Sequence, residues 1–456
     1  MNPRRPRRPW SDLFEAPSRE GSSEPLSRQA DLIAEEYSAH LDAGKRLCLQ
    51  PYALSPHNLL TPLIDGDEAF GSMLAAIGAA TVSVDVETYI WECDKVGKQF
   101  ADLLSAKARA GLRVRVVADG AGAWSASALF EEMEAAGAQV VFFHPMSPWR
   151  QRWGWSVRDH RKLTLVDARI AFLGGTNIGD EYASIASGGH GWHDIHARVE
   201  GPVVRGLHRL FDDAFRYATG LRTRGWQLLR EPRGRRGPGL PTGGTHPAPR
   251  DPAEPVGGAS PETPLSAKDL VAAGTAQLQV LAVGRRRDRR VIQRHYQFAV
   301  AMARTRVSIF SAYFIPNKTW RRTLTRAAMR GVQVRILVPR TNDIPAIHFA
   351  SRYTYQSLLD AGVRIFEYLP VMLHAKAMVV DGSWCAIGSY NLDQRSLMYN
   401  WEVAIAGLDG PSCARLDEQL ETDLLKSREI DGARWRQRGW LAKTKERFFY
   451  FFRLFL

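Results

Sequence analysis

The sequence has 456 residues, more than most single domains, and its length therefore predicts two domains. Hydrophobic residues make up 45% and charged residues 24%, which is typical of a soluble protein with a well-packed core. Its 61 Lys and Arg against 48 Asp and Glu give a formal net charge of +13, which favours a polyanionic partner, either nucleic acid or an anionic membrane surface.

The distribution of apolar residues predicts a protein that lies on a membrane rather than crossing it. No stretch reaches the roughly 20 apolar residues that span a bilayer. The arginines near the start are not followed by the apolar run of a signal peptide. Cys48, Cys93, Cys385 and Cys413 lie far apart without metal-type spacing, which predicts reduced thiols and favours a cytoplasmic protein.

The chain divides into five predicted segments. Residues 1–50 are rich in Pro, Arg, Ser and Glu, and they predict a mobile basic tail with a short helix near 32–41. Residues 231–266 are dense in Pro and Gly, which predicts a linker. The other three predicted segments are a first domain at 51–230, a second domain at 267–430 and a basic, aromatic segment at 431–456.

The two predicted domains repeat one pattern of strands and helices. Apolar strand-like runs alternate with segments of helical periodicity, which indicates a sheet covered by helices on both faces. The runs are 81–91, 110–120 and 136–145 in the first domain, and 306–316, 330–340 and 361–370 in the second. An internal duplication is therefore visible, and the expected fold is α/β: two similar domains, each a mixed sheet flanked by helices.

One set of polar residues follows the third run of each domain. Counted from a His, both sets have Lys at +2, Asp at +7, two small residues at +14 and +15, and Asn at +17. The first set is His160, Lys162, Asp167, Gly174, Gly175 and Asn177, and the second is His374, Lys376, Asp381, Gly388, Ser389 and Asn391. A single His-x-Lys is common by chance, whereas a duplicated spacing indicates a shared chemistry.

These residue types suit phosphodiester transfer. Residues two apart in a strand point to one face, so the His and Lys of each set are expected to project together. Lysines neutralise phosphate oxygens, while one imidazole can attack phosphorus and the other can protonate the leaving alcohol. No carboxylate or Cys/His cluster is spaced for a divalent metal, so we expect neither a metal nor another cofactor.

The paired motifs resemble those of the phospholipase D superfamily, and their context is similar to that of the bacterial cardiolipin synthases. The resemblance runs from about residue 57 to about residue 430. Besides the motifs it rests on DGDEAF, ETYIW, GGTNIGDEY, WHDIHARVEGP and SYNLDQRSLMYNWE. The sequence resembles the shorter type, which has no N-terminal membrane-spanning segments and associates with the membrane from one side.

The resemblance implies an active site at the domain interface and a covalent phosphohistidine intermediate. We expect His160 to be the nucleophile and His374 the acid and base, although the symmetry of the motifs does not distinguish them. Asp194 and Glu402 are each expected to orient the histidine of their own half. One chain supplies both motifs, so an oligomer is not required.

The remaining motif residues receive expected roles from the same resemblance. Asn177, Asn391, Gly175 and Ser389 are expected to bind the substrate phosphate. Asp167 and Asp381 belong to the catalytic motifs, but we expect them to hold loop and strand together rather than to touch phosphorus. The expected catalytic motif set is thus His160, Lys162, Asp167, His374, Lys376 and Asp381.

Three basic or aromatic segments favour a lipid substrate. Residues 434–456 mix Lys and Arg with Trp and Phe, which suits a helix on an anionic bilayer, or else a helix that packs on the protein body. Residues 148–159 contain three tryptophans beside the first motif and fit either a membrane-dipping lip or an inserted core loop. A basic run at 285–290 suits lipid or nucleic-acid phosphate equally.

The expected reaction is transfer of a phosphatidyl group from phosphatidylglycerol to a second phosphatidylglycerol, which gives cardiolipin. The expected partners are therefore anionic phospholipids and a membrane surface, with no nucleic acid, and the expected location is the cytoplasmic side of the bacterial inner membrane. A hydrolytic phospholipase D that makes phosphatidic acid is the main alternative. A nuclease with the same catalytic residues and a non-catalytic lipid-binding protein are weaker alternatives.

Overall fold

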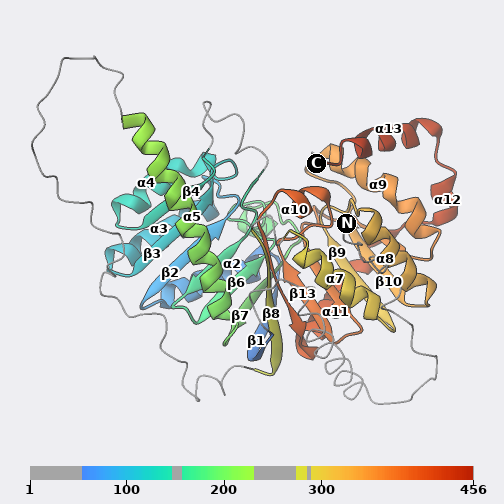
Figure 1. Ribbon diagram of the computed structural model, residues 1–456, viewed down its shortest axis with the longest axis horizontal. Coiled ribbons are helices and arrows are strands. Elements are labelled where there is room, and N and C mark those ends of the chain that lie inside the picture. The colour runs from blue at the N-terminus through green and yellow to red at the C-terminus, as the bar shows by residue number, and fades with distance from the viewer. Residues whose placement is uncertain (1–53, 146–156, 231–273, 285–288, 455–456) are drawn as a thin grey trace, which may run out of the picture. The chain divides into compact units, whose positions relative to one another are not determined.

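The computed structural model describes residues 54–145, 157–230, 274–284 and 289–454 (Figure 1). Several sequence predictions fall wholly or mainly outside these ranges. They are the tail at 1–50, the linker at 231–266, the tryptophan-rich stretch at 148–159 and most of the basic run at 285–290.

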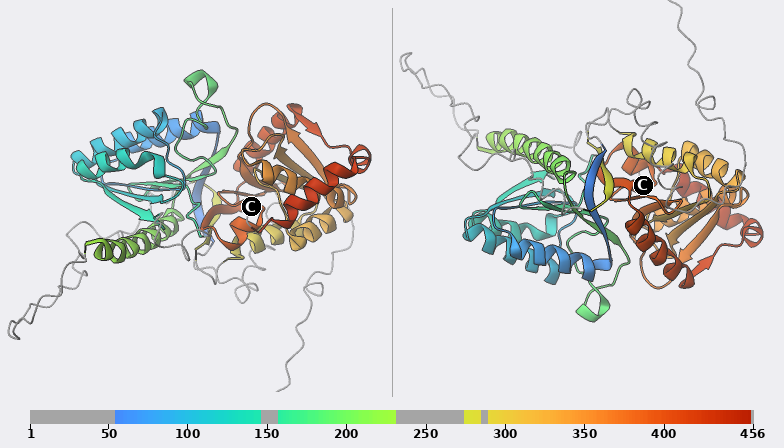
Figure 2. Two further views of the ribbon diagram at one scale, coloured as in Figure 1. Left: turned by 90° about the horizontal axis from the view of Figure 1, so that it is seen from above. Right: turned by 90° about the horizontal axis from the view of Figure 1, so that it is seen from below.

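The first half alternates strands and helices. Its second strand is buried along its whole length, because helices cover the sheet on both faces. The elements are β1 (Ser55–Ile64), α2 (Asp65–Ala79), β2 (Ser83–Thr88), α3 (Lys95–Arg109), β3 (Arg113–Asp119), η2 (Trp124–Ala126), α4 (Ser127–Ala135), β4 (Gln139–Phe143), β5 (Leu163–Val166), β6 (Ile170–Gly174), η3 (Ile185–Ser187), β7 (Ile195–Glu200) and α5 (Val204–Arg230). Helices α2, α3 and α4 lie on one face of the sheet and α5 on the other (Figure 2).

The second half repeats this order and adds elements at its end. They are β8 (Ala276–Val283), α7 (Val291–Met302), β9 (Arg306–Ser311), α8 (Lys318–Met329), β10 (Gln333–Pro339), α9 (Pro345–Leu359), β11 (Arg364–Tyr368), β12 (Lys376–Val380), β13 (Trp384–Gly388), α10 (Gln394–Met398), β14 (Glu402–Leu408), α11 (Gly410–Leu425), β15 (Ser427–Glu429), α12 (Gly432–Arg436) and α13 (Trp440–Phe451). The predicted α/β fold with two similar halves is confirmed.

The two halves share one sheet. Within the described ranges this sheet has 15 strands in the order β15-β11-β10-β9-β12-β13-β14-β8-β1-β7-β6-β5-β2-β3-β4, and the two repeats run outward from the centre in the same sequence. At the centre β1 pairs antiparallel with β8, with an irregular register between Ser55 and Asn58. The sequence predicted two sheets, whereas the structure joins them edge to edge.

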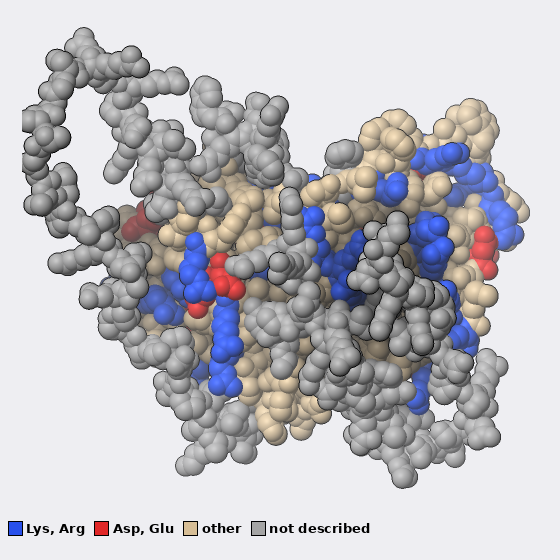
Figure 3. All heavy atoms as spheres, viewed as in Figure 1, with Lys and Arg blue, Asp and Glu red and all other residues tan. Residues whose placement is uncertain are grey.

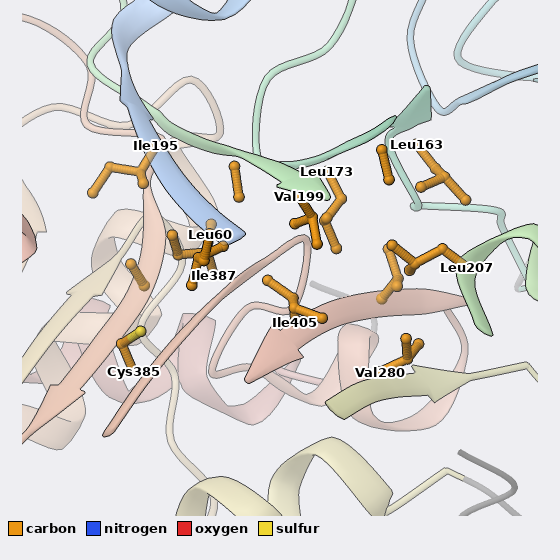
Figure 4. Packing of buried hydrophobic residues seen from close by; sticks show 14 of the residues in the cluster. Leu60, Leu163, Leu173, Ile195, Val199, Leu207, Val280, Cys385, Ile387 and Ile405 are labelled. Carbon is orange, nitrogen blue, oxygen red and sulfur yellow. The ribbon is translucent and has the colours of Figure 1, made fainter. Parts of the chain in front are cut away.

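A hydrophobic core extends across this junction. Leu173 and Val199 of the first half belong to the same buried cluster as Val280, Ile387 and Ile405 of the second half (Figure 4). Separating the halves would expose this apolar surface to water, at a cost of roughly 25 cal/mol for each Å². The shared core therefore fixes the position of one motif relative to the other.

Polar side chains define where several helices begin. Asp94 accepts a hydrogen bond from the Gly97 amide at 2.8 Å at the start of α3. Asn317 does the same for the Trp320 amide at 3.0 Å at the start of α8. Such caps satisfy amides that have no partner within the first helical turn.

The C-terminal segment forms two helices where the sequence predicted one. α12 ends at Arg436 and α13 begins at Trp440, with Gly439 at its N-cap. Phe449 and Tyr450 of α13 stack on Phe349 and Tyr353 of α9. In the ranges that the structure describes, no helix is both long enough and apolar enough to cross a membrane.

Candidate active site

Each His-x-Lys motif lies in an extended segment that enters a strand, because β5 begins at Leu163 and β12 at Lys376. Backbone hydrogen bonds hold both segments against the other half. The His160 amide donates to the Trp401 carbonyl at 3.0 Å, and the His374 amide donates to the His193 carbonyl at 2.7 Å. Trp401 and His193 are the residues just before Glu402 and Asp194, so each motif lies beside the acid of the opposite half.

The histidine–carboxylate pairs therefore cross between the halves. His160 Nδ1 lies 3.2 Å from Glu402 Oε2, and His374 Nδ1 lies 2.8 Å from Asp194 Oδ2. The prediction that each acid orients the histidine of its own half is wrong. Asp194 directly precedes β7 and Glu402 begins β14, and both strands lie near the junction with the other half. When Nδ1–H donates to the carboxylate, Nε2 keeps its lone pair for chemistry.

Burial and neighbouring lysines keep the two rings neutral. Burial and then Lys162 lower the pKa of His160 to about 4, although Glu402 opposes them. Burial, Lys376 and Lys162 lower the pKa of His374 well below its ordinary value. Each half's lysine thus acts on the other half's histidine, which means that the two motifs form one electrostatic unit.

The pKa values of the two carboxylates shift in opposite directions. Burial raises the pKa of Glu402, but its interactions with His160, Lys162 and Ser389 more than offset burial and lower that pKa overall. Burial raises the pKa of Asp194 to about 6 in spite of the charge on Lys376. Glu402 is therefore the more permanent anion.

The motif lysines are buried beside their histidines. Lys162 Nζ donates to the His160 carbonyl at 2.8 Å, and Lys376 Nζ donates to the His374 carbonyl. Burial lowers the pKa of Lys162 to about 7 and that of Lys376 to about 8. A bound phosphate anion would favour their charged forms again.

The two asparagines differ in how far their amides are used. Asn177 donates to the Tyr182 hydroxyl at 2.6 Å and accepts from the Ile90 amide at 3.2 Å. Asn391 Oδ1 is buried and, among the described residues, has no hydrogen-bond partner. Of the two motif asparagines, Asn391 is therefore the one whose side-chain carbonyl is left unpaired.

Gly175 and Ser389 contact the carboxylates. A Cβ atom on Gly175 would lie 2.2 Å from Asp194 Oδ1, so the glycine makes room for that acid. Ser389 Oγ donates to Glu402 Oε2, and it accepts from the Val403 amide at 3.1 Å. Both residues had been predicted to bind phosphate, whereas the contacts present here are with the acids that orient the histidines.

Asp167 and Asp381 hold loops, as the residue pattern suggested. Asp167 accepts hydrogen bonds from the amides of residues 81–83 at 2.8–3.0 Å, and Asp381 accepts from those of residues 304–306 at 2.8–2.9 Å. Both acids have positive φ, 52° and 51°, at the turns that end β5 and β12. Since these carboxylates bond to loop amides, we assign them structural rather than catalytic roles.

Sequence reasoning missed an aromatic wall around His374. The Tyr182 hydroxyl lies 3.3 Å from His374 Nδ1, and the rings of Trp192 and Tyr313 lie 5.7 and 6.2 Å from the imidazole. Tyr182 follows Asn177 by five residues in the segment GGTNIGDEY, and that proximity was an available signal. Tyr89 lies 4.9 Å from the His160 ring in the corresponding place.

Sequence reasoning also missed His193, a buried histidine just before β7 that pairs with two carboxylates. His193 Nδ1 lies 2.5 Å from Asp65 Oδ1, and His193 Nε2 lies 2.8 Å from Asp423 Oδ2. Burial lowers the pKa of His193, but the hydrogen bonds to Asp423 and Asp65 raise it to about 10. The resulting imidazolium joins α2 to α11 next to Asp194.

The chemistry open to this arrangement is transfer of a phosphoryl-type group to one imidazole, while the other imidazole gives and takes the proton. Two neutral rings, two lysines and the unpaired amide carbonyl of Asn391 lie within a buried interface. Among the residues that the structure describes, no three His, Cys, Asp or Glu side chains are grouped to hold a metal ion.

Comparison with known proteins gives matches along both halves. A family model described as "Cardiolipin synthase, PLD-like domain" matches residues 73–185 and 299–424. The chain is 31% identical over 385 residues to a cardiolipin synthase of Geobacillus kaustophilus (strain HTA426), covering 84% of this chain and 70% of that protein. It is 31% identical over 375 residues to cardiolipin synthase A of Pseudomonas syringae pv. syringae (strain B728a), covering 82% and 70%.

The fold is also found in solved structures of lower identity. The phosphatidylserine synthase of Haemophilus influenzae Rd KW20 is similar with a TM-score of 0.65 and 12% identity, over 91% of this chain and 99% of that chain. The polyphosphate kinase of Porphyromonas gingivalis has a TM-score of 0.51 and 16% identity, over 82% and 49%. At these identities the likeness shows the fold alone.

Proposed function

The chain belongs to the PLD-like cardiolipin synthase family, and from that premise we propose that it is a phosphatidyltransferase that makes cardiolipin from phosphatidylglycerol through a phosphohistidine. The observation that carries the proposal is the pair of buried imidazoles, each hydrogen-bonded to a carboxylate of the other half. The relatives named cardiolipin synthase support the choice of lipid.

The first step is attack by His160 on a first phosphatidylglycerol. The Nε2 lone pair of His160 forms a bond to phosphorus, and the bond from phosphorus to the glycerol headgroup oxygen breaks. That oxygen takes a proton from His374, and glycerol leaves. The charge of the bound phosphate offsets Lys162 and Lys376, which favours the protonated form of His374 in the complex.

The second step reverses the direction of proton transfer. His374, now neutral, takes the proton from a hydroxyl of a second phosphatidylglycerol, and that oxygen attacks phosphorus. The bond from phosphorus to His160 breaks, which releases cardiolipin and restores both rings. The unpaired carbonyl of Asn391 is a fitting acceptor for the incoming hydroxyl. If water enters instead, the product is phosphatidic acid.

The partners follow from the reaction. The substrate and product are anionic phospholipids, so we propose a peripheral protein on the bacterial inner membrane, on its cytoplasmic side. The net charge of +13 supports binding to such a surface. Because one chain supplies both histidines and both carboxylates, a monomer is sufficient.

The test uses vesicles of labelled phosphatidylglycerol, with lipid products and glycerol separated after incubation. We expect cardiolipin and glycerol from the unaltered protein, and at least a ~10³-fold loss in His160→Ala and His374→Ala. His190→Ala, at an exposed histidine, is the matched control and should keep full activity.

The products distinguish the possible outcomes. Phosphatidic acid without cardiolipin would make the protein a hydrolase. Full activity in either motif variant would overturn the two-histidine mechanism.

A further inference from the structure

Helix α13 is held to the protein through one face. Phe449 stacks on Phe349 with ring centroids 5.4 Å apart, and Tyr450 stacks on Tyr353 at 4.3 Å. Glu446 is buried and pairs with Arg438 and with Arg352, the latter at 3.4 Å. These contacts fix the rotation of α13 about its axis.

The opposite face of α13 is apolar and open to solvent. Phe448 is 58% exposed and Phe451 74% exposed, and Trp440 lies on the same side two turns earlier. Residues spaced by three and four positions form one stripe on a helix. Large aromatic side chains in such a stripe are unusual at a surface that faces only water.

Cations accompany this stripe. Figure 3 shows Lys and Arg gathered over the region of α12 and α13 with few acidic side chains among them. Lys443 and Arg447 are exposed, and within the described part of the chain Arg447 makes no ion pair. Phenylalanines beside cations match the boundary between the headgroups and acyl chains of an anionic bilayer.

A groove of about 420 Å³ lies within this surface. It is lined by Arg447, Arg453 and Thr444 together with four aromatic residues, Tyr353, Phe448, Tyr450 and Phe451. Arg453 is held in place, since it donates to the Tyr450 carbonyl at 3.1 Å and lies 4.5 Å from the Tyr450 ring. Guanidinium groups bind phosphate oxygens well, and rings suit the adjoining acyl chain.

We propose that this groove and the apolar stripe of α13 form a second anionic-phospholipid site, separate from the catalytic site, through which the protein docks on the bilayer. The lipid phosphate lies between Arg447 and Arg453, and Phe448 and Phe451 enter the acyl boundary. The inference rests on the proposed function only in taking the substrate to be a membrane lipid.

The docking site lies close to the aromatic wall around His374. On the inner side of α13, Phe449 and Tyr450 pack against a small core of Ile315, Ile347 and Ala350. Tyr313 packs against the same core, and its ring lies 6.2 Å from the His374 ring. The docked membrane would therefore lie near the half of the site that holds the acid and base.

Vesicle sedimentation tests the docking. The full chain is mixed with phosphatidylglycerol–phosphatidylcholine vesicles or with phosphatidylcholine vesicles, and the bound fraction gives a partition constant. We expect the double variant Phe448→Ser/Phe451→Ser to bind anionic vesicles at least ~10-fold more weakly. Arg447→Ala should weaken binding about fivefold, and only for anionic vesicles.

Matched controls separate docking from folding and from catalysis. Trp124→Ser and Arg209→Ala change an exposed aromatic and an exposed cation on other elements, and should bind like the unaltered chain. Turnover of monomeric short-chain phosphatidylglycerol should be the same in all variants. Unchanged binding of the α13 variants, or equal binding to both vesicle types, would overturn the docking site. Normal binding without any lipid turnover would instead overturn the proposed function.

Discussion

The two histidines have the same backbone setting but different surroundings. His160 pairs with Glu402, which also accepts from Ser389, whereas His374 pairs with Asp194, whose space depends on Gly175. The first carboxylate has a lowered pKa, and the second has a pKa raised to about 6.

This difference assigns the roles that motif symmetry leaves open. A nucleophile that becomes positively charged on phosphorylation benefits from a permanent anion, which fits His160 beside Glu402. A histidine that gives and takes a proton benefits from a partner carboxyl whose pKa lies closer to neutral pH, which fits His374 beside Asp194. The two backbones are similar, but the side chains around the histidines differ. Glu402 is one methylene longer than Asp194, and Ser389 has a hydroxyl where Gly175 has no side chain.

Removing the carboxylate charges should have the largest effect on this comparison. We expect Glu402→Gln and Asp194→Asn each to lower kcat by about 10²–10⁴, because an amide does not stabilise a positive imidazole. With a nitrophenol leaving group, which needs no proton, the first step of Asp194→Asn should recover and that of Glu402→Gln should not. Release of nitrophenol in a rapid-mixing experiment measures this. Recovery of the Glu402 variant alone would mean that the roles of the two histidines are exchanged.

Exchanging the small residues tests the carboxylate settings themselves. Gly175→Ser would place a Cβ atom 2.2 Å from Asp194 Oδ1, so we expect about a 100-fold loss of activity. Ser389→Gly removes one donor to Glu402 and should cost less than about tenfold. Steady-state kinetics with melting temperatures as a folding control measure both. Equal losses would contradict the difference between the two halves.

His193, the residue before Asp194, allows a test of folding stability. At His193 the folded pKa of about 10 exceeds the ordinary 6.5, so its stabilisation is complete below about pH 6.5 and is lost as pH rises towards 10. We expect His193→Gln to lower the free energy of unfolding by about 3 kcal/mol near pH 6.5, because Asp423 stays buried without its cation. Denaturant unfolding of both proteins at pH 6.5, 8 and 9.5 should show this difference shrinking. A constant difference would mean that His193 does not act through its charge.

The two lysines should determine the alkaline pH profile. The protonated forms bind phosphate, so kcat/KM should be full below about pH 7, fall about tenfold per pH unit between the pKa values of about 7 for Lys162 and 8 for Lys376, and fall about 100-fold per pH unit above both. In Lys162→Arg the remaining decline should start near pH 8, at a lower overall rate. Rates with monomeric short-chain phosphatidylglycerol from pH 6 to 10 measure this. A profile that is flat to pH 10 would contradict the role of burial.

Local patterns in the sequence predicted most of the fold and the residues of the site. Alternating strand and helix runs, together with two motifs at equal spacing, were enough for the α/β duplication, and the family resemblance implied Asp194 and Glu402 as partners of the histidines. They did not predict which histidine each acid meets, because that depends on the chain packing at the junction of β1 and β8. They also missed His193, whose partners lie 128 and 230 residues away.

The crossed pairs have a consequence for the origin of the chain. Neither half alone contains a complete histidine–carboxylate pair, so a single-copy ancestor would have needed a second subunit, arranged about a twofold axis, to complete its chemistry. In a single chain the two halves need not be identical. Separately expressed halves should therefore be inactive alone and regain activity only when they associate.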